Sequence, residues 1–234
     1  MPVLPSAKKL KDLGGHLGHL RKVLHPTFKP YVAEIKNKVV FIDTKKTVDA
    51  LALAVDFLKS HSKEKVLWVG TKVSAKDMIK EIGEELNHPY VAEKWLGGMI
   101  TNFETLRKNL ERLESLRSEE KSQRFKEMTK KEKRLLQQKR ERLEKVLAGL
   151  VDLKEVPQIM VVVDPAHEKI AVQEAYKKGL TVVAIADANA DLTHIDYPIP
   201  LNDESRLALR EVLKTLARCF DPKFSFAEKT KKKK

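Results

Sequence analysis

The chain has 234 residues, a formal net charge of +13 and a single cysteine, Cys219. This length can bury one sizeable core without disulfides or a structural metal, and a lone cysteine excludes an internal disulfide, so we expect a reducing, cytoplasmic setting. No apolar run reaches the roughly 18 residues that span a bilayer, and the residues after Met1 do not resemble a secretory signal, which argues against a membrane or secreted protein.

Positive charge is concentrated in three segments. Residues 1–38 hold 8 lysines and arginines against 2 acids, residues 101–150 hold 15 against 9, and residues 218–234 hold 7 against 2. The remainder holds 16 against 20, so a mildly acidic body carries basic extensions. This segregation is typical of proteins that contact a phosphate backbone. Basic tails that only aid solubility are the alternative.

Residues 1–38 combine several glycines and prolines with little periodicity, which predicts an irregular basic arm. Its donors are closely spaced, as contacts with RNA phosphates require, and the candidates are Lys8, Lys9, Lys11, His16, His19, Arg21, Lys22 and Lys29. His16 and His19 stand three residues apart, but no third ligand lies near them in the chain, so no metal site is predicted. The glycines at 14–18 are not a dinucleotide fingerprint, because no strand precedes them.

Apolar runs and helical periodicity alternate through residues 39–100, which predicts βα units. The predicted strands are 39–42, 65–70 and 90–91, and the predicted helices begin at Asp43-Thr44 and near Ser74. Trp95 and Leu96 then precede Gly97 and Gly98, a pair that permits positive φ or close approach of another chain segment.

Residues 101–150 lack proline and carry leucines at helical spacing, including Leu136, Leu143 and Leu150 seven apart. Thr101 with Glu104, and Thr129 with Glu132, have the spacing of capping boxes. We predict two helices, each on the order of 25 Å long, that fold back as an antiparallel coiled-coil hairpin inserted in the body. Further candidate phosphate contacts at the root of this hairpin are Arg107, Lys108 and Arg112.

A second βα series follows, so residues 1–100 and 151–226 are predicted to form one α/β body. The run IMVVV at 159–163 is typical of a central parallel strand, since such strands are buried on both faces. A helix ending at Gly179, a strand at 180–186, a short strand at Ile199 and a helix from Asn202-Asp203 to Ala217 complete the body. The basic tail 227–234 is predicted to be disordered.

Asp43, Asp164 and Asp187 each follow a predicted strand. Ligands of open parallel sheets bind at the carboxyl ends of the strands, so these aspartates could hold Mg²⁺ in a metal-dependent phosphotransferase or nucleotide-binding enzyme. Each also stands where a helix is expected to begin, where a carboxylate caps free amides. No phosphate-binding loop follows Gly70 and no nucleophile elbow or zinc-protease motif occurs. We therefore predict no enzyme and no cofactor, and keep catalysis as the alternative.

Eight sequence blocks are distinctive: GGHLGH at 14–19, PYV at 30–32, FIDTKKT at 41–47, VGTK at 69–72, KWLGGMITNFETL at 94–106, VVDPAHEKIAVQEA at 162–175, IADANAD at 185–191 and YPIPLNDES at 197–205. In content and order they resemble the bacterial family of the second protein of the small ribosomal subunit. The resemblance extends over nearly the whole chain. The chain departs from the usual family pattern at Leu24-His25-Pro26, where the family has Trp-Asn-Pro, and at Leu192 and Leu201.

The resemblance implies a flavodoxin-like, three-layer αβα parallel sheet carrying the inserted hairpin. It also implies a structural constituent of a cytoplasmic or organellar ribosome that binds small-subunit ribosomal RNA and neighbouring ribosomal proteins. The messenger-binding ribosomal protein built of OB-fold repeats is a further expected partner, with docking around Asp187, Asp191 and Asp203. A hairpin that binds another protein helix rather than RNA is a third possibility.

Overall fold

Uniformly apolar segments form a five-stranded parallel sheet in the computed structural model, which describes residues 2–227. The strands are β4 (Val66–Val69), β5 (Tyr90–Val91), β6 (Ile159–Val163), β7 (Thr181–Ala186) and β8 (Tyr197–Pro200). Their order is β5-β4-β6-β7-β8, which matches the 2-1-3-4-5 order of flavodoxin-type doubly wound sheets. The central strand β6 is buried along its whole length, as its apolar sequence predicts.

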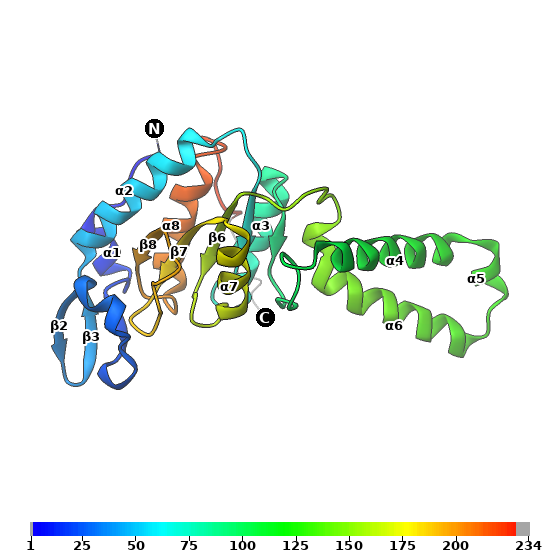
Figure 1. Cartoon of the computed structure of the whole chain (residues 1–234), viewed down its shortest axis with the longest axis horizontal. Coiled ribbons are helices and arrows are strands. Elements are labelled where there is room, and N and C mark those ends of the chain that lie inside the picture. The colour runs from blue at the N-terminus through cyan, green and yellow to red at the C-terminus, as the bar shows by residue number, and fades with distance from the viewer. Residues whose placement is uncertain (1, 228–234) are drawn as a thin grey trace, which may run out of the picture.

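Helices cover both faces of this sheet (Figure 1). On one face lie α2 (Thr44–Ser60), α3 (Lys76–Leu86) and α8 (Arg206–Ala217), which bury their leucines and isoleucines against Trp68 and its neighbours. On the other face lie α7 (Lys169–Lys178), the loop around Trp95 and the roots of the inserted helices. The predicted α/β fold with a parallel sheet between helices is confirmed.

Residues 1–38 do not form an irregular arm, so that prediction is wrong. They contain α1 (Ala7–Asp12), β1 (Leu17–Leu20), the 3₁₀ turns η1 (Arg21–Val23) and η2 (Pro26–Tyr31), and β2 (Val32–Lys36). Strands β1 and β2 flank β3 (Val39–Ile42) in a separate antiparallel sheet, so β3 is not part of the parallel sheet. Leu10 and Phe28 are fully buried in the body. Pairing between distant strands, invisible in local periodicity, orders this region.

Several predicted element boundaries also change. Helix α8 begins at Arg206 and is capped by Ser205, not by Asn202-Asp203. The first inserted helix is capped by Asn102, whose side chain accepts a hydrogen bond from the Thr105 amide, so the predicted Thr101 capping box is wrong. Strand β8 contains two prolines, which its position at the edge of the sheet tolerates.

The inserted segment consists of α4 (Phe103–Lys121), the short α5 (Gln123–Glu127), α6 (Lys130–Leu147) and the turn η3 (Ala148–Leu150). Helices α4 and α6 lie side by side and extend away from the body (Figure 1). Ion pairs join them, with Arg117 2.5 Å from Glu144 and Arg140 2.9 Å from Glu120. The predicted capping box of Thr129 and Glu132 is present.

Apart from Ala227, the predicted basic tail 227–234 lies outside the described residues. Within residues 2–227, none of the helices has both the length and the apolarity needed to cross a lipid bilayer.

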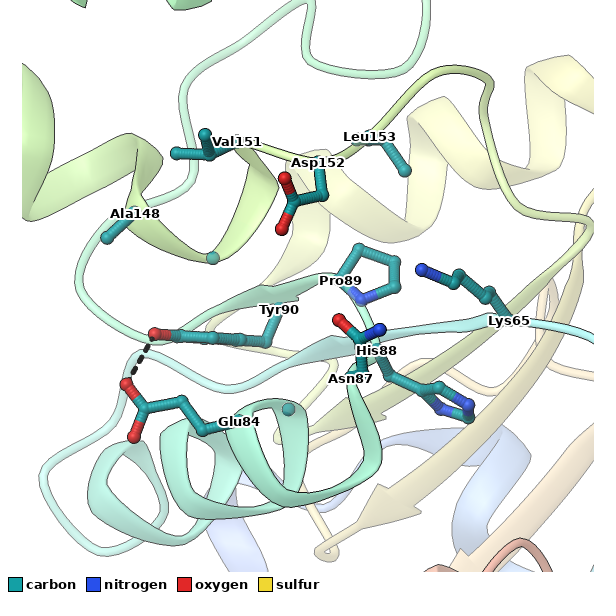
Figure 2. Close-up of a pocket in the computed structure, with 12 residues that line it drawn as sticks. Lys65, Glu84, Asn87, His88, Pro89, Tyr90, Ala148, Val151, Asp152 and Leu153 are labelled. Carbon is teal, nitrogen blue, oxygen red and sulfur yellow. Dashed lines mark hydrogen bonds between the residues drawn. The ribbon is translucent and has the colours of Figure 1, made fainter.

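Tyr90 occupies the junction between the insert and the body (Figure 2). Its side chain lies between α3 and η3, where a Cβ at Gly83 would fall 2.2 Å from the tyrosine ring and a Cβ at Gly149 would fall 2.3 Å from the tyrosine carbonyl oxygen. The Tyr90 hydroxyl donates to Glu84 at 3.2 Å, and burial, reinforced by that carboxylate, raises the pKa of Tyr90 to about 12. Glycine is therefore required at both positions for the insert to leave the body as it does.

Candidate functional site

Charged side chains gather at the carboxyl edge of the parallel sheet, as predicted for an open α/β sheet. Lys72 follows β4, Asp164 follows β6, Asp187 follows β7 and Asp203 follows β8. The ammonium nitrogen of Lys72 lies 2.6 Å from Asp203 Oδ1 and 3.2 Å from Asp164 Oδ2. All three aspartates are at most 5% exposed. We call these four residues the strand-end cluster.

Burial and mutual repulsion shape the protonation of this cluster. Burial, followed by the charge of Asp164, raises the pKa of Asp203 to about 7. Burial also acts to raise the pKa of Asp164, but the amide of His167, a hydrogen bond with Asp203 and the ammonium of Lys72 outweigh it and lower that pKa. One lysine thus serves two carboxyl groups, and Asp203 is the group that takes up a proton near neutral pH.

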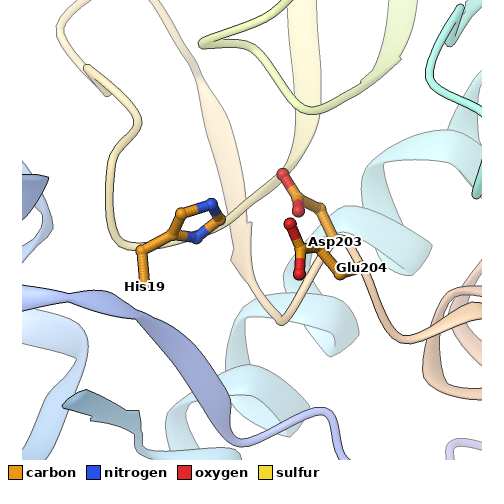
Figure 3. A group of neighbouring side chains, drawn as sticks. All are labelled: His19, Asp203 and Glu204. Atoms are coloured by element: carbon orange, nitrogen blue, oxygen red, sulfur yellow. The ribbon is translucent and has the colours of Figure 1, made fainter.

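His19 reaches the strand-end cluster from β1. Its Nδ1 lies 3.0 Å from Asp187 Oδ2, and this hydrogen bond is the main cause that raises the pKa of His19. Ligand atoms of His19, Asp203 and Glu204 lie within 4.8 Å of one another (Figure 3). An imidazole and two carboxylates are donor types that bind zinc and similar divalent ions. Spacing along the chain did not reveal this set, because the carboxylates come from the far end of the sequence.

Asp43, the third aspartate of the enzyme hypothesis, is not part of this cluster. It caps α2 and accepts a hydrogen bond from the Lys45 amide at 2.9 Å, so the capping interpretation is confirmed there. The same interpretation is wrong for Asp164, which has a φ of 59° and accepts from His167 before the helix begins. It is also wrong for Asp187, which accepts from the Ala188 amide in a segment with no helix.

The sheet order reverses between β4 and β6, the point at which doubly wound proteins bind nucleotides. A crevice of about 260 Å³ lies beside this point, and Thr71 and Glu168 line it. The carboxylate of Glu168, only 4% exposed, accepts hydrogen bonds from both the amide and the hydroxyl of Thr71, at 2.9 and 2.5 Å. The chain's own carboxylate therefore occupies the donors that a phosphate would need.

Glu174, on α7, organises the loop that leads into the insert, a role that the sequence did not reveal. Its carboxylate accepts hydrogen bonds from the indole of Trp95, the amides of Gly98 and Ile100, and both the amide and the hydroxyl of Thr101, at 2.6 to 3.2 Å. Burial alone would raise the pKa of Glu174, but these donors outweigh it and lower that pKa. No spacing rule connects residues so far apart in the chain.

Most predicted phosphate contacts lie on the surface. Exposed are Lys8, Lys9, Lys11, Arg21, Lys22, Lys29, Arg107, Lys108 and Arg112. Lys9 pairs with Glu211 at 2.7 Å, and the half-buried His16 packs near Phe41. His19 is engaged by Asp187, as described above. Of the predicted docking residues, Asp187 and Asp203 are buried, whereas Asp191 is exposed and accepts hydrogen bonds from Thr193.

Comparisons with known proteins point to one family. The model of the family "Ribosomal protein S2" matches residues 10–221. Three similar proteins are all named small ribosomal subunit protein uS2. The protein from Amoebophilus asiaticus is 38% identical to this chain, and the match covers 96% of this chain and 72% of the relative. The protein from Cytophaga hutchinsonii is 42% identical, with 85% of this chain and 79% of the relative covered. The protein from Chloroherpeton thalassium is also 42% identical, with 89% of this chain and 86% of the relative covered. The chain therefore belongs to the ribosomal protein S2 family, whose members have a structural role in the small ribosomal subunit.

Proposed function

We propose that this chain is a non-enzymatic constituent of the small ribosomal subunit that binds small-subunit ribosomal RNA and neighbouring ribosomal proteins. The observation that carries the proposal is the family match over residues 10–221, together with exposed cations held on ordered elements. Lys8 and Lys11 lie on α1, Arg21 and Lys22 on η1, and Lys29 on η2. Cations fixed on packed elements bind phosphates with a small loss of conformational entropy.

We also infer that the insert is an antiparallel coiled-coil hairpin whose root contributes Arg107, Lys108 and Arg112 to RNA binding. Buried leucines on both helices and the ion pairs between α4 and α6 support this arrangement. A hairpin that binds another protein helix is the competing interpretation. Crosslinking from an α6 position near the tip, such as Lys131, would identify RNA or protein as the neighbour.

The crevice at the switch point supports a non-catalytic role. Glu168 satisfies the Thr71 donors, so a nucleotide phosphate would have to displace a buried carboxylate. The competing phosphotransferase was predicted to use Asp43, Asp164 and Asp187 as metal ligands, of which Asp164 and Asp187 lie in the strand-end cluster. Replacing them with asparagine would abolish nucleotide turnover by the purified chain under that hypothesis, whereas we expect no turnover to be present in the first place.

The rim of the strand-end cluster is the proposed docking place for the messenger-binding ribosomal protein. Glu204, 4.0 Å from the Lys72 ammonium, is an exposed acid at this rim, and Asp191 is an exposed acid four residues after Asp187. Val73 and Leu207 are 76% and 63% exposed, and Ser74 links the segment of Val73 to the Asp203 backbone at 2.8 Å. Apolar residues beside acids fit a partner surface that is apolar and basic.

Sedimentation tests the main proposal. A tagged chain in cell extract should travel with small subunits, and accumulation at the top of the gradient would contradict the proposal. In filter binding, neutralising six to eight phosphates predicts that log affinity for small-subunit RNA falls with log salt at a slope of about −5 to −7.

A variant that combines four substitutions tests whether the N-terminal cations form the RNA-binding surface. Replacing Lys8, Lys11, Arg21 and Lys22 with glutamine should make that slope shallower by about 3 to 4. Lys80→Gln is the matched control, because this lysine pairs with Glu84 on its own helix. An unchanged slope in the combined variant would exclude this surface.

A further inference from the structure

One face of α7 differs from the rest of the body surface in its composition. Lys169, Gln173, Tyr176 and Lys177 follow one another at steps of four, three and one, and Ile170 lies beside them, so all five share one arc of the helix. All five are exposed. The opposite side of the helix faces the core through Ala171, Val172 and Ala175.

This outer face of α7 has no carboxylate of its own. The two acids associated with the helix, Glu168 and Glu174, are 4% and 6% exposed and accept hydrogen bonds inside the body, as described above. The face therefore presents two ammonium groups, one amide and one phenol. Its net charge is positive, whereas residues 39–100 and 151–217, to which α7 belongs, together hold 16 lysines and arginines against 20 acids.

Tyr176 is stacked on one side only, in the contacts of the described residues. Its ring lies against the imidazole of His194 with centroids 3.9 Å apart and an interplanar angle of 24°. Tyr176 is nevertheless 59% exposed. His194 thus fixes the orientation of a ring that remains accessible, which lowers the entropy lost when another flat group stacks on it.

We propose that this face of α7 binds an unpaired nucleotide of RNA. The base stacks on the exposed surface of Tyr176, the Gln173 amide hydrogen bonds its edge, and Lys169 and Lys177 contact the flanking phosphates. Stacking on an aromatic ring beside lysines is how proteins bind single-stranded RNA. The inference rests on the proposed RNA-binding function and adds a site separate from the N-terminal cations.

The composition of the face favours a nucleotide over a protein helix. A helix that docks on another helix needs a continuous apolar stripe, and here Ile170 is the single aliphatic side chain. Asp191, an exposed acid three residues before His194, accepts hydrogen bonds from the amide and the hydroxyl of Thr193. A polyanion therefore meets donors rather than acceptors at this face.

The test compares Tyr176→Ala with Tyr176→Phe in the full chain, with a single-stranded oligoribonucleotide carrying 2-aminopurine as the probe. The unmodified chain and the phenylalanine variant should quench the probe by stacking. The alanine variant should bind about tenfold to a hundredfold more weakly. Because the side chain is exposed, melting temperatures should agree among the three proteins.

The salt dependence separates stacking from charge. Tyr176→Ala should leave the salt slope unchanged, whereas Lys177→Gln should make it shallower by about 0.7. Equal quenching by the alanine variant and the unmodified chain would overturn the α7 site while leaving the proposed function intact. If the unmodified chain did not bind RNA at all, the proposed function itself would be overturned. Photocrosslinking of residue 176 to a protein, not to RNA, in intact small subunits would also overturn the α7 site.

Discussion

Glu174 and Asp203 are both buried carboxyl groups, 6% and 0% exposed, yet their surroundings move their pKa values in opposite directions. Glu174 faces four hydrogen-bond donor residues and no second acid among them, so it stays ionised. Asp203 faces Asp164 and Asp187 and shares one lysine. Burial therefore does not decide the charge of a carboxyl group. The balance between donors and neighbouring acids decides it.

The opposite pKa shifts distinguish Glu174, which has a structural role, from Asp203, which belongs to a cluster whose charge is not balanced. Glu174 shapes one conformation of the loop around Trp95 and has no free capacity for a ligand. The strand-end cluster has more acid than base, an imbalance that a cation or a basic partner can neutralise. Four perturbations test this contrast, in decreasing order of expected effect.

The largest effect is expected from Glu174→Ala. The substitution leaves the Trp95 indole and the amides of Gly98, Ile100 and Thr101 without their acceptor, and each buried unsatisfied group costs about 1–3 kcal/mol before relaxation. We expect the free energy of unfolding to fall by about 4 kcal/mol in urea denaturation. Glu114→Ala, an exposed glutamate on α4, is the control and should change stability by less than about 0.5 kcal/mol. Similar values for both would show that Glu174 does not hold the loop.

Lys72→Met should rank second. It removes the ammonium that lies between Asp164 and Asp203 while keeping most of the side-chain volume, so buried carboxylates lose their counter-ion. Breaking such a pair costs about 3 kcal/mol, moderated here because Asp203 can take up a proton. Lys76→Met is the matched control, since its 3.6 Å contact with Glu93 is a surface pair worth under about 1 kcal/mol. If both variants lost the same free energy of unfolding, the Lys72 ion pairs would contribute no more to stability than an ordinary surface pair.

Acid titration should separate the two carboxyl environments further. The folded-state pKa of Glu174 lies below its unfolded value of 4.5, so its stabilisation is present above that pH and is lost as the pH falls through the folded-state pKa. The stability difference between the unmodified chain and Glu174→Gln should therefore shrink on acidification below about pH 4.5. Chemical denaturation at a series of pH values measures it. A difference that is constant with pH would mean that the carboxylate charge is not what the loop needs.

The smallest expected effect is a shift in the His19 titration. The hydrogen bond to Asp187 raises the pKa of His19 above 6.5, so the stabilisation is present below the unfolded pKa and is lost as the pH rises through the folded one. In Asp187→Asn, NMR in metal-free buffer should show a lower His19 pKa. Asp191→Asn, which neutralises an exposed acid outside the contacts of His19, is the control and should leave the His19 pKa unchanged. A His19 pKa unchanged by Asp187→Asn would exclude the pair with Asp187.

Local sequence patterns correctly predicted two kinds of element: those fixed by contacts between neighbouring residues and those made of a uniformly apolar run. The run at 159–163 became β6, and the capping box at Thr129 became the start of α6, because each depends on neighbouring residues. The small antiparallel sheet was missed. Its strands β1 and β2 lie in a segment rich in glycine and proline, and they pair with β3 rather than form a local periodic pattern. Lys72, Glu168 and Glu174 were missed because their partners lie between 73 and 131 residues away along the chain. The strand-end aspartates were found, but their environment depends on strand order, which no local pattern contains.

The contacts of Tyr90 and Glu174 also bear on how the insert can vary. Glu174 holds the chain where it enters the insert, and Tyr90, between Gly83 and Gly149, holds the place where the chain returns. Thr101 precedes α4 and Gly149 follows α6, so both contacts lie outside the two long helices. Shortening or lengthening α4 and α6 together by whole turns would therefore leave both anchor points undisturbed. We therefore expect that the length of the α4–α6 segment can change without altering the sheet that supports it.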